Sequence, residues 1–249
     1  MKTRRHILHV AMISAVAAGG WGFQAAQKAA EPVDPLIAGF QKSTVASVAD
    51  AVDQVVGKRG FMAHYMMPRV PGKVAGRAVT ALMREATPDK ATPALSAKHS
   101  VGMIDAAKPG EVGIIVIENG LDVAGLGGLM ATAAKARGMA GVVIDGGARD
   151  IAEVRALGLP VYSRSVVPSS SVGRYATVAN GIPVKCAGIE VKPGDIIVAG
   201  EDGVVVVPQE KAMDVLKRSQ EIDERESKML PLIKQYRALG KAIEMFNRI

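Results

Sequence analysis

Residues 142–150, Val-Val-Ile-Asp-Gly-Gly-Ala-Arg-Asp, decide the fold of this chain. The first three are β-branched and apolar, which is typical of a strand buried on both faces of a parallel sheet. Two glycines follow, and an Arg-Asp pair then opens a predicted helix over 150–156. In parallel α/β sheets ligands bind at the carboxyl ends of strands, and glycines let the backbone approach a ligand closely. The segment therefore predicts a ligand site at Arg149 and Asp150.

Strands and helices alternate around this segment, which is typical of βαβ units and a mainly parallel sheet. The chain has 249 residues, a length that suits one large α/β domain. A helix capped by Ser43 or Thr44 is expected to begin the domain, and residues 57–72 to form a loop. The other strands are predicted over 76–83, 112–117, 140–144 and 159–162, and the other helices over 93–107 and 128–137.

The end of the domain changes character. Short strands are predicted over 182–184, 189–191, 196–198 and 204–207, separated by glycine-containing turns. They indicate a small β meander or barrel-like lobe. The only cysteine, Cys186, excludes an intramolecular disulfide and is expected to be a buried small hydrophobe. A charged helix follows from Gln209 to about Lys228, Pro231 is expected to break it, and a last helix runs to the C-terminus.

The N-terminus has the layout of an export signal. Lys2-Thr-Arg-Arg-His is basic, residues 7–18 are apolar, and Gly19-Gly20 follows. Residues 3–8 also resemble a twin-arginine signal. We expect residues 1–26 to be an export signal peptide and the protein to be periplasmic or exported. The alternative is an uncleaved membrane anchor, although the run is short for a span of about 20 residues.

The net charge is +7, part of it at the N-terminus and the rest spread along the chain. A nucleic-acid binder usually gathers such charge on one face. We therefore interpret it as solubility charge and expect no nucleic-acid partner and no stable membrane partner. Aromatic residues make up only 4% of the chain, so the core must be built from aliphatic side chains and methionine.

The residues of the predicted site allow more than one interpretation. Asp150 can ligate a hard cation, and Arg149 can fork onto a carboxylate or an enolate oxygen. Alternatively, Asp150 merely caps the helix that follows it. A glycine pair also begins the Ala-rich helix at residue 128, where exposed N–H groups favour an anion, although a tight turn explains the pair equally well. A loop for S-adenosylmethionine is disfavoured because Asp-Gly-Gly-Ala lacks the G-x-G spacing.

The segment from Gly127 to Asp150 resembles the core motif of the RraA-like family. This family includes the class II 4-hydroxy-4-methyl-2-oxoglutarate aldolases and the regulators of ribonuclease E. Further similarity lies at 43–50, 74–80, 192–195 and 202–208, so the resemblance spans roughly residues 35–230. It implies an α/β/α sandwich with swivelling-domain (phosphohistidine-domain-like) topology. We expect residues 30–249 to form one such domain with a C-terminal helical extension, assembled as a homotrimer or hexamer with its site between subunits.

The resemblance also implies the roles of the site residues. Asp150 would hold Mg2+ or Mn2+, and Arg149 would contact the substrate and its enolate. Backbone amides would hold the carboxylate of a small 2-oxo-acid substrate, and an acidic residue from the C-terminal region of a neighbouring subunit would orient water at the metal. The amides belong to Gly127, Gly128, Leu129 and Met130, and the candidate acids are Glu226, Glu224 and Glu221.

One position departs from the aldolases. Some of them carry an aspartate twenty-one positions before the arginine, where this chain has Gly128. Other members have glycine there and an acidic residue three positions after the aspartate, which here is Glu153. Positions 150 and 153 share a helix face, so Glu153 could reach the water around the metal, or it could be an ordinary solvated residue.

The expected function is a divalent-metal-dependent lyase that cleaves a 2-oxo acid through a pyruvate enolate, of the 4-hydroxy-4-methyl-2-oxoglutarate aldolase or oxaloacetate decarboxylase type. The alternatives are a non-catalytic regulator of ribonuclease E and a degenerate ligand-binding module. Other polar residues carry weaker expectations. His64 and His99 are interpreted as solvated or capping residues, and Arg164 as a strand-end residue that could touch substrate.

Overall fold

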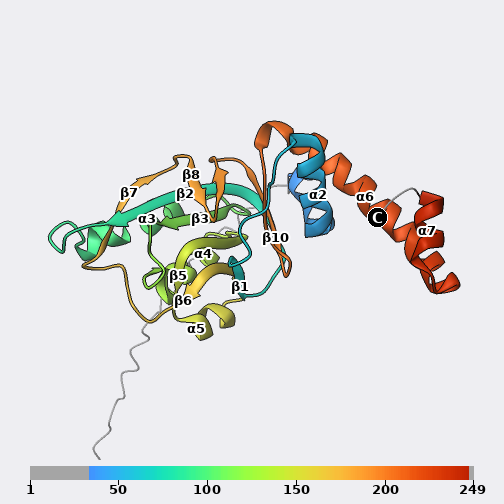
Figure 1. Ribbon diagram of the computed structural model, residues 1–249. Helices are drawn as coiled ribbons and strands as arrows, with labels where there is room; N and C mark the ends of the chain where they lie inside the picture. The colour runs from blue at the N-terminus through green and yellow to red at the C-terminus, as the bar shows by residue number, and fades with distance from the viewer. Residues whose placement is uncertain (1–33, 247–249) are drawn as a thin grey trace, which may run out of the picture. The chain divides into compact units, whose positions relative to one another are not determined.

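The computed structural model describes residues 34–246 of the chain (Figure 1). The predicted export signal and the alternative membrane anchor both lie outside the described residues. Among the helices between residues 34 and 246, none combines the length and the apolar character needed to cross a membrane.

A mixed sheet forms the centre of the fold. The strands β2 (Val74–Glu85), β3 (Val112–Ile117), β5 (Gly141–Ala148) and β6 (Val161–Val166) run parallel to one another, in the order β6-β5-β3-β2. Antiparallel strands extend both edges: β1 (Met67–Val70) beside β6, and β10 (Ile196–Gly200) with β11 (Gly203–Val207) beside β2. Two further strands pair with the ends of longer ones: β4 (Ala124–Leu126) with β5, and β7 (Tyr175–Asn180) with β2.

The sheet curls until its edges almost meet. Phe61, just before β1, forms a bridge with Val205 of β11, and the Met62 amide donates to the Val204 carbonyl at 2.8 Å. This nearly closed sheet confirms the predicted α/β class. Swivelling-domain topology remains a prediction.

Three apolar clusters hold these layers together. The interior of the curled sheet is filled by side chains such as Ile114, Val143 and Ile197, and the small hairpin of β8 (Val184–Cys186) and β9 (Ile189–Val191) contributes to it. Cys186 is buried there, as predicted. Helices α3 (Pro93–Ala106), α4 (Gly128–Ala136) and α5 (Ile151–Ala156) cover the outer face of β3 and β5. Helices α1 (Pro35–Lys42), α2 (Val45–Val56) and α6 (Ala212–Tyr236) cover β10 and β11.

The structure corrects several predictions at the level of elements. The last strands do not form a lobe of their own, because β10 and β11 join the main sheet and only β8 and β9 stand apart. Residues 57–72 are not all loop, since they contain β1, and β7 was not predicted. Helix α6 follows a short 3-10 turn (Gln209–Lys211) and is not broken at Pro231. It ends at Arg237, whose φ is 48°, and α7 (Leu239–Phe246) packs back on it.

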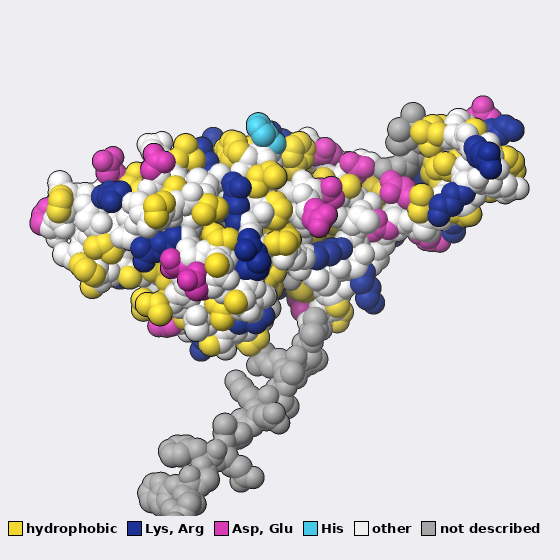
Figure 2. All heavy atoms as spheres, turned by 90° about the horizontal axis from the view of Figure 1, so that it is seen from below, with side chains coloured by type: hydrophobic (Ala, Val, Ile, Leu, Met, Phe, Trp, Pro, Cys, Tyr) yellow, Lys and Arg dark blue, Asp and Glu magenta, His cyan; other side chains and the backbone are white. Residues whose placement is uncertain are grey.

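Charged side chains of both signs are interspersed on the face of the molecule drawn in Figure 2. Lysine and arginine alternate there with aspartate, glutamate and hydrophobic residues. The interpretation of the +7 charge of the whole chain as solubility charge remains a prediction.

Candidate functional site

The two predicted halves of the site come together at the carboxyl ends of β4 and β5. These strands pair in parallel, with Ala124 beside Gly147 and Leu126 beside Ala148. The chain leaves β4 through Gly127 into α4 and leaves β5 through Arg149 and Asp150 into α5. The glycine pair and the Arg-Asp pair are therefore neighbours, as the sequence predicts.

Asp150 joins the two halves directly. It stands at the N-cap position of α5 with a φ of 55°, and its carboxylate makes no capping bond to that helix. Its Oδ2 accepts a hydrogen bond from the Gly128 amide at 2.8 Å instead. A non-glycine residue in the left-handed region is uncommon and often marks a functional position. The capping interpretation of Asp150 is wrong, because the carboxylate is turned toward the start of α4.

This bond changes the expected role of the backbone amides. The Gly128 amide is occupied by Asp150, so it does not point freely at a substrate in this structure. The Leu129 and Met130 amides also precede the first i→i−4 bond of α4, which runs from Ala131 to the Gly127 carbonyl at 2.9 Å. The N-cap residue of α4 is Gly127, which has no side chain that could accept from these amides. Leu129 and Met130 are therefore the better donors for an anion.

Arg149 stands beside the same carboxylate. Its Nε lies 3.7 Å from Asp150 Oδ2, and the two side chains are 41% and 44% exposed. Both charged groups are thus open to solvent and to a ligand. An exposed pair of this kind adds little stability, which favours a role in binding over a role in the fold.

A cavity of about 230 Å³ opens at this point. It is lined by β4 and the start of α4, and by Arg149 and Asp150. Helix α3 and the loop before β7, which was not predicted to take part, line it as well. Those additional lining residues are Ala97, Ser170, Ser171 and Val172. The Pro168-Ser-Ser-Ser run and Gly173 are the features of the sequence that mark this loop as irregular.

Position 128 is close to Glu153. A Cβ atom built on Gly128 would lie 3.8 Å from the Glu153 Cβ and 3.6 Å from Asp150 Oδ2. These are ordinary van der Waals distances, so a Cβ atom at this position meets no clash. The Cβ atom of Glu153 therefore lies next to the position that the Cβ atom of a residue at 128 would occupy. This proximity is what the first interpretation of Glu153, as a residue that reaches the water around the metal, requires. The Glu153 side chain is exposed, as the solvated interpretation requires, so both interpretations remain predictions.

The C-terminal acids lie elsewhere within one chain. Glu221 and Glu224 line a separate cavity with Arg225, Lys228 and Phe246. Glu221 pairs with Arg218 at 2.9 Å, and Glu224 pairs with Lys228 at 2.6 Å, which lowers the pKa of Glu224. Glu226 lies on the same helix. A contribution of these acids to the site of a neighbouring subunit remains a prediction.

Two residues with weaker expectations have structural roles. His99 is fully buried in α3, where its Nδ1 lies 2.7 Å from the Ser96 carbonyl and its Nε2 lies 2.8 Å from the Gly125 carbonyl. Burial lowers the pKa of His99, so a solvated role is wrong. Arg164 is paired with the buried Asp145 at 3.1 Å and does not line the cavity at Asp150.

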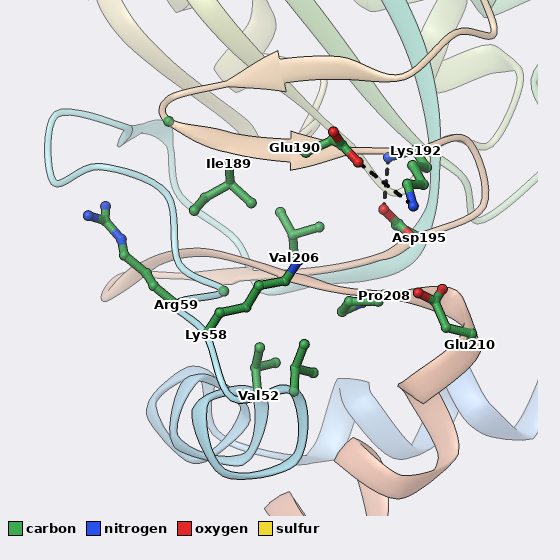
Figure 3. Close-up of a pocket in the computed structure, with 13 residues that line it drawn as sticks. Val52, Lys58, Arg59, Ile189, Glu190, Lys192, Asp195, Val206, Pro208 and Glu210 are labelled. Atoms are coloured by element: carbon green, nitrogen blue, oxygen red, sulfur yellow. Dashed lines mark hydrogen bonds and ion pairs between the residues drawn. The ribbon is translucent and has the colours of Figure 1, made fainter.

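A second cavity, of about 220 Å³, lies between α2 and strands β9 and β11 (Figure 3). Three of the charged residues that line it, Glu190, Lys192 and Asp195, bond to one another or to the backbone. Lys192 Nζ lies 3.7 Å from Glu190 Oε1, and the buried Asp195 accepts from the Lys192 and Gln209 amides at 2.8 and 3.0 Å. These bonds fix the turn at Pro193 and Gly194, so this cavity is the weaker candidate for a reaction.

The Asp150 carboxylate in this cavity is a ligand of the kind that hard divalent cations prefer. No group of three or more histidine, cysteine, aspartate or glutamate residues gathers anywhere within residues 34–246. A zinc-type cage is therefore not the model for this site. Mg2+ commonly takes one or two carboxylates and completes its octahedron with water and substrate oxygens. The half-exposed Asp150 carboxylate, held on one oxygen by Gly128, fits that pattern.

Comparison with known proteins agrees with the fold and with the motif. The family model RraA-like, described as Aldolase/RraA, matches residues 45–206. The chain belongs to the RraA-like family.

Solved structures support this assignment over most of the chain. A protein of Pseudomonas syringae pv. tomato superposes with a TM-score of 0.76 and 28% identity, covering 86% of this chain and 96% of that one. RraAS2 of Streptomyces coelicolor, described as an unusual member of the RNase ES inhibitor RraA family, gives a TM-score of 0.69 and 26% identity, covering 79% and 96%.

The curated relatives align with a smaller part of this chain than the solved structures do. A 4-hydroxy-4-methyl-2-oxoglutarate aldolase of Thermus thermophilus is 33% identical over 98 residues, which is 39% of this chain and 59% of that protein. The chain spans about half the length of the first curated relatives that it matches. Family membership is thus shown by the domain, whereas the reaction has to be argued from the site.

Proposed function

We propose that this RraA-like protein is a divalent-metal-dependent lyase that releases pyruvate from a 2-oxo acid. The observation that carries the proposal is the Asp150 carboxylate, bonded to the Gly128 amide at 2.8 Å and lying 3.7 Å from Arg149 Nε at the mouth of a cavity. A carboxylate and a guanidinium thus line the same small cavity.

Each residue has a defined role in this reaction. Mg2+ or Mn2+ held at Asp150 would supply a Lewis acid for the 2-oxo group. The amides of Leu129 and Met130 donate to the substrate carboxylate. Arg149 stabilises the negative charge that develops on the enolate oxygen. Glu153, which does not itself line the cavity, would orient a water molecule that takes up the proton leaving the C4 hydroxyl. Aldol cleavage and decarboxylation of oxaloacetate pass through the same enolate, so one site can perform both.

The experiment is a pyruvate-release assay with oxaloacetate and with 4-hydroxy-4-methyl-2-oxoglutarate, in Mg2+, in Mn2+ and with chelator. Asp150→Asn should abolish metal-dependent turnover and weaken Mg2+ binding measured by calorimetry. Asp53→Asn, at an exposed position on α2, is the matched control and should behave as wild type. Metal-dependent turnover by Asp150→Asn at the wild-type rate would refute the assignment.

A second candidate is supported by the solved relatives, since two of them are described as inhibitors of RNA processing or of RNase ES. A non-catalytic binding protein would release no pyruvate and would lower ribonuclease E activity in a purified assay. We also propose that the protein is exported, as its N-terminal residues predict, and export would separate it from a cytoplasmic ribonuclease. Cell fractionation of the full chain tests this directly.

We further propose that the protein assembles as a homotrimer or hexamer. Leu129, beside Gly128 at the mouth of the cavity, is 91% exposed in the single chain. A large apolar side chain so exposed at a site suits a surface that a neighbouring copy covers. Light scattering of the purified protein measures the assembly, and a monomer would refute it.

A further inference from the structure

Strand β5 is irregular directly before it reaches the site. It lies beside β6 (Figure 1), and the register of this parallel pair shifts between Ile144 and Gly147. As a result Asp145 and Gly146 face a single residue of β6, Arg164. An extra residue of this kind interrupts the ladder of hydrogen bonds and bends the strand, and such bulges are common next to active sites. The backbone link between β5 and β6 is therefore weakened just where the chain leads to the site.

An ion pair spans this irregular stretch. Asp145 Oδ1 lies 3.1 Å from Arg164 Nη1, and the two side chains are only 12% and 24% exposed. The Arg164 guanidinium also stacks on the Tyr65 ring, 4.6 Å from its centroid. Asp145 and Arg164 thus supply a side-chain link between β5 and β6 at the position where the ladder is shifted.

The second oxygen of Asp145 holds a third element. Asp145 Oδ2 accepts a hydrogen bond from the Ala187 amide at 2.6 Å. Ala187, with a φ of 45°, lies in the turn between β8 and β9, and its carbonyl accepts from the Ala63 amide at 2.9 Å. One buried carboxylate therefore connects β5, β6 and the β8–β9 hairpin.

Stability is a weak reason for a charged pair at this place. Asp145 follows Val143 by two residues on β5, and Val143 belongs with Cys186 and Ala187 to the apolar cluster inside the curled sheet. Taking two charges out of water costs about as much as their attraction returns, so apolar residues of similar size are often equally stable. A hydrogen-bonded ion pair does, however, fix one arrangement of the strands that it joins.

The position of this link in the chain connects it to the site. Gly146 and Gly147 follow Asp145, and glycine restricts the backbone less than any other residue. Beyond them, the Arg149 amide donates to the Leu126 carbonyl at 3.0 Å. Asp145 therefore anchors the chain before the two glycines, and the site residues follow directly after them.

From these observations we propose that Asp145 and Arg164 are a positioning pair, which holds the end of β5 so that the Asp150 carboxylate meets the Gly128 amide. Neither residue of the pair lines the cavity at Asp150, so both act through the backbone of β5 and not by touching a substrate. The inference rests on the proposed function in one respect, because the carboxylate that is positioned is the proposed metal ligand. Loss of a residue that supports a metal ligand typically lowers metal affinity or activity 10- to 100-fold.

The test uses two variants of the purified full chain, Asp145→Asn and the double variant Asp145→Asn/Arg164→Met. The single variant leaves a buried guanidinium without its carboxylate and should unfold at a lower temperature. The double variant removes both charges and should recover most of that stability. In both variants we expect amide exchange at Gly128, followed by mass spectrometry of the peptide that contains it, to be at least tenfold faster. The affinity for Mg2+ and kcat/KM for pyruvate release should be at least tenfold lower.

Asp195→Asn is the matched control. Asp195 is 4% exposed and Asp145 8%, and Asp195 accepts from two backbone amides at the turn before β10. Its replacement should lower stability but leave exchange at Gly128 and the affinity for Mg2+ unchanged. Wild-type exchange at Gly128 in the stable double variant, or an equal change in the control, would overturn the inference. A wild-type chain that releases no pyruvate would overturn the proposed lyase function instead, and the exchange measurement would still decide the role of the pair.

Discussion

Replacing Gly127 by alanine should damage the site without damaging the fold. A Cβ atom at this position would lie 2.8 Å from Asp150 Oδ2 and 3.0 Å from Arg149 Nε, so the two charged groups would have to move. The atoms in the way are side-chain atoms and not backbone. The φ of Gly127 is −136°, a region that alanine adopts without strain. We therefore expect the free energy of unfolding to change by less than about 1 kcal/mol.

The expected loss of activity follows from the bond that would be displaced. A hydrogen bond to a charged group contributes about 1.5–3 kcal/mol. Because the Asp150 side chain is 44% exposed, the lower value applies, and about 1.5 kcal/mol corresponds to roughly tenfold. Gly127→Ala should lower kcat/KM for pyruvate release and the affinity for Mg2+ by about tenfold each.

The neighbouring glycine provides the matched control. A Cβ atom at Gly128 would meet nothing closer than 3.6 Å, so Gly128→Ala should keep both activity and Mg2+ affinity near wild type. The coupled pyruvate assay and calorimetry measure both variants, and thermal unfolding checks the fold. Equal losses in the two variants, or no loss in Gly127→Ala, would refute the geometric reasoning.

Three further predictions concern Glu153, His99 and Pro231. Glu153→Gln should lower pyruvate release about 10- to 100-fold, and Gly128→Asp in the same chain should restore part of it if position 128 and Glu153 serve one role. Burial lowers the pKa of His99 below its ordinary value of 6.5. As the pH falls below 6.5, His99 therefore binds a proton in the unfolded chain but stays neutral in the native protein. The free energy of unfolding should then decrease from pH 7 toward pH 5 by up to about 1.4 kcal/mol per pH unit. His99→Gln should abolish this slope, whereas His64→Gln, at an exposed position, should keep it. Pro231→Ala should slow amide exchange in the last turns of α6 at least tenfold, since proline removes one helical bond at a typical cost of about 3 kcal/mol, whereas Lys234→Ala should not.

Two of the strands that the sequence predicts correctly are buried on both faces. Residues 112–117 and 140–144 are continuous apolar runs, and they form β3 and the first part of β5. The strand β7 contains Tyr175, Thr177 and Asn180 and is mostly half-buried, so it lacks both a continuous apolar run and a clean alternation. Its pairing with β2 is a long-range contact that local pattern does not encode.

Pro231 and His99 show how tertiary packing overrides local rules. Helix α6 continues through Pro231 because Met229 is buried and α7 packs on this part of the helix. His99 stands in a predicted helix among polar residues, which favours a solvated role. The ring is buried because Gly125, which is distant in the sequence, presents a carbonyl to it. The partner that satisfies a buried polar group comes from the fold, so the sequence alone could not name it.

The conformation of Asp150 explains why the site was predictable in its residues but not in its bonds. A strand that ends in Arg-Asp before a helix predicts a capping aspartate, since capping is the commonest use of that position. With a φ of 55°, Asp150 does not cap α5 but reaches Gly128 at the start of α4. The same turn leaves Arg149, bonded through its amide to the Leu126 carbonyl at 3.0 Å, on the cavity side of β4. Because Asp150 adopts the left-handed region, its carboxylate does not cap α5 but bonds to the first residue of α4, beside the Arg149 guanidinium. That arrangement requires glycine at position 127, where any side chain would stand between the two charges.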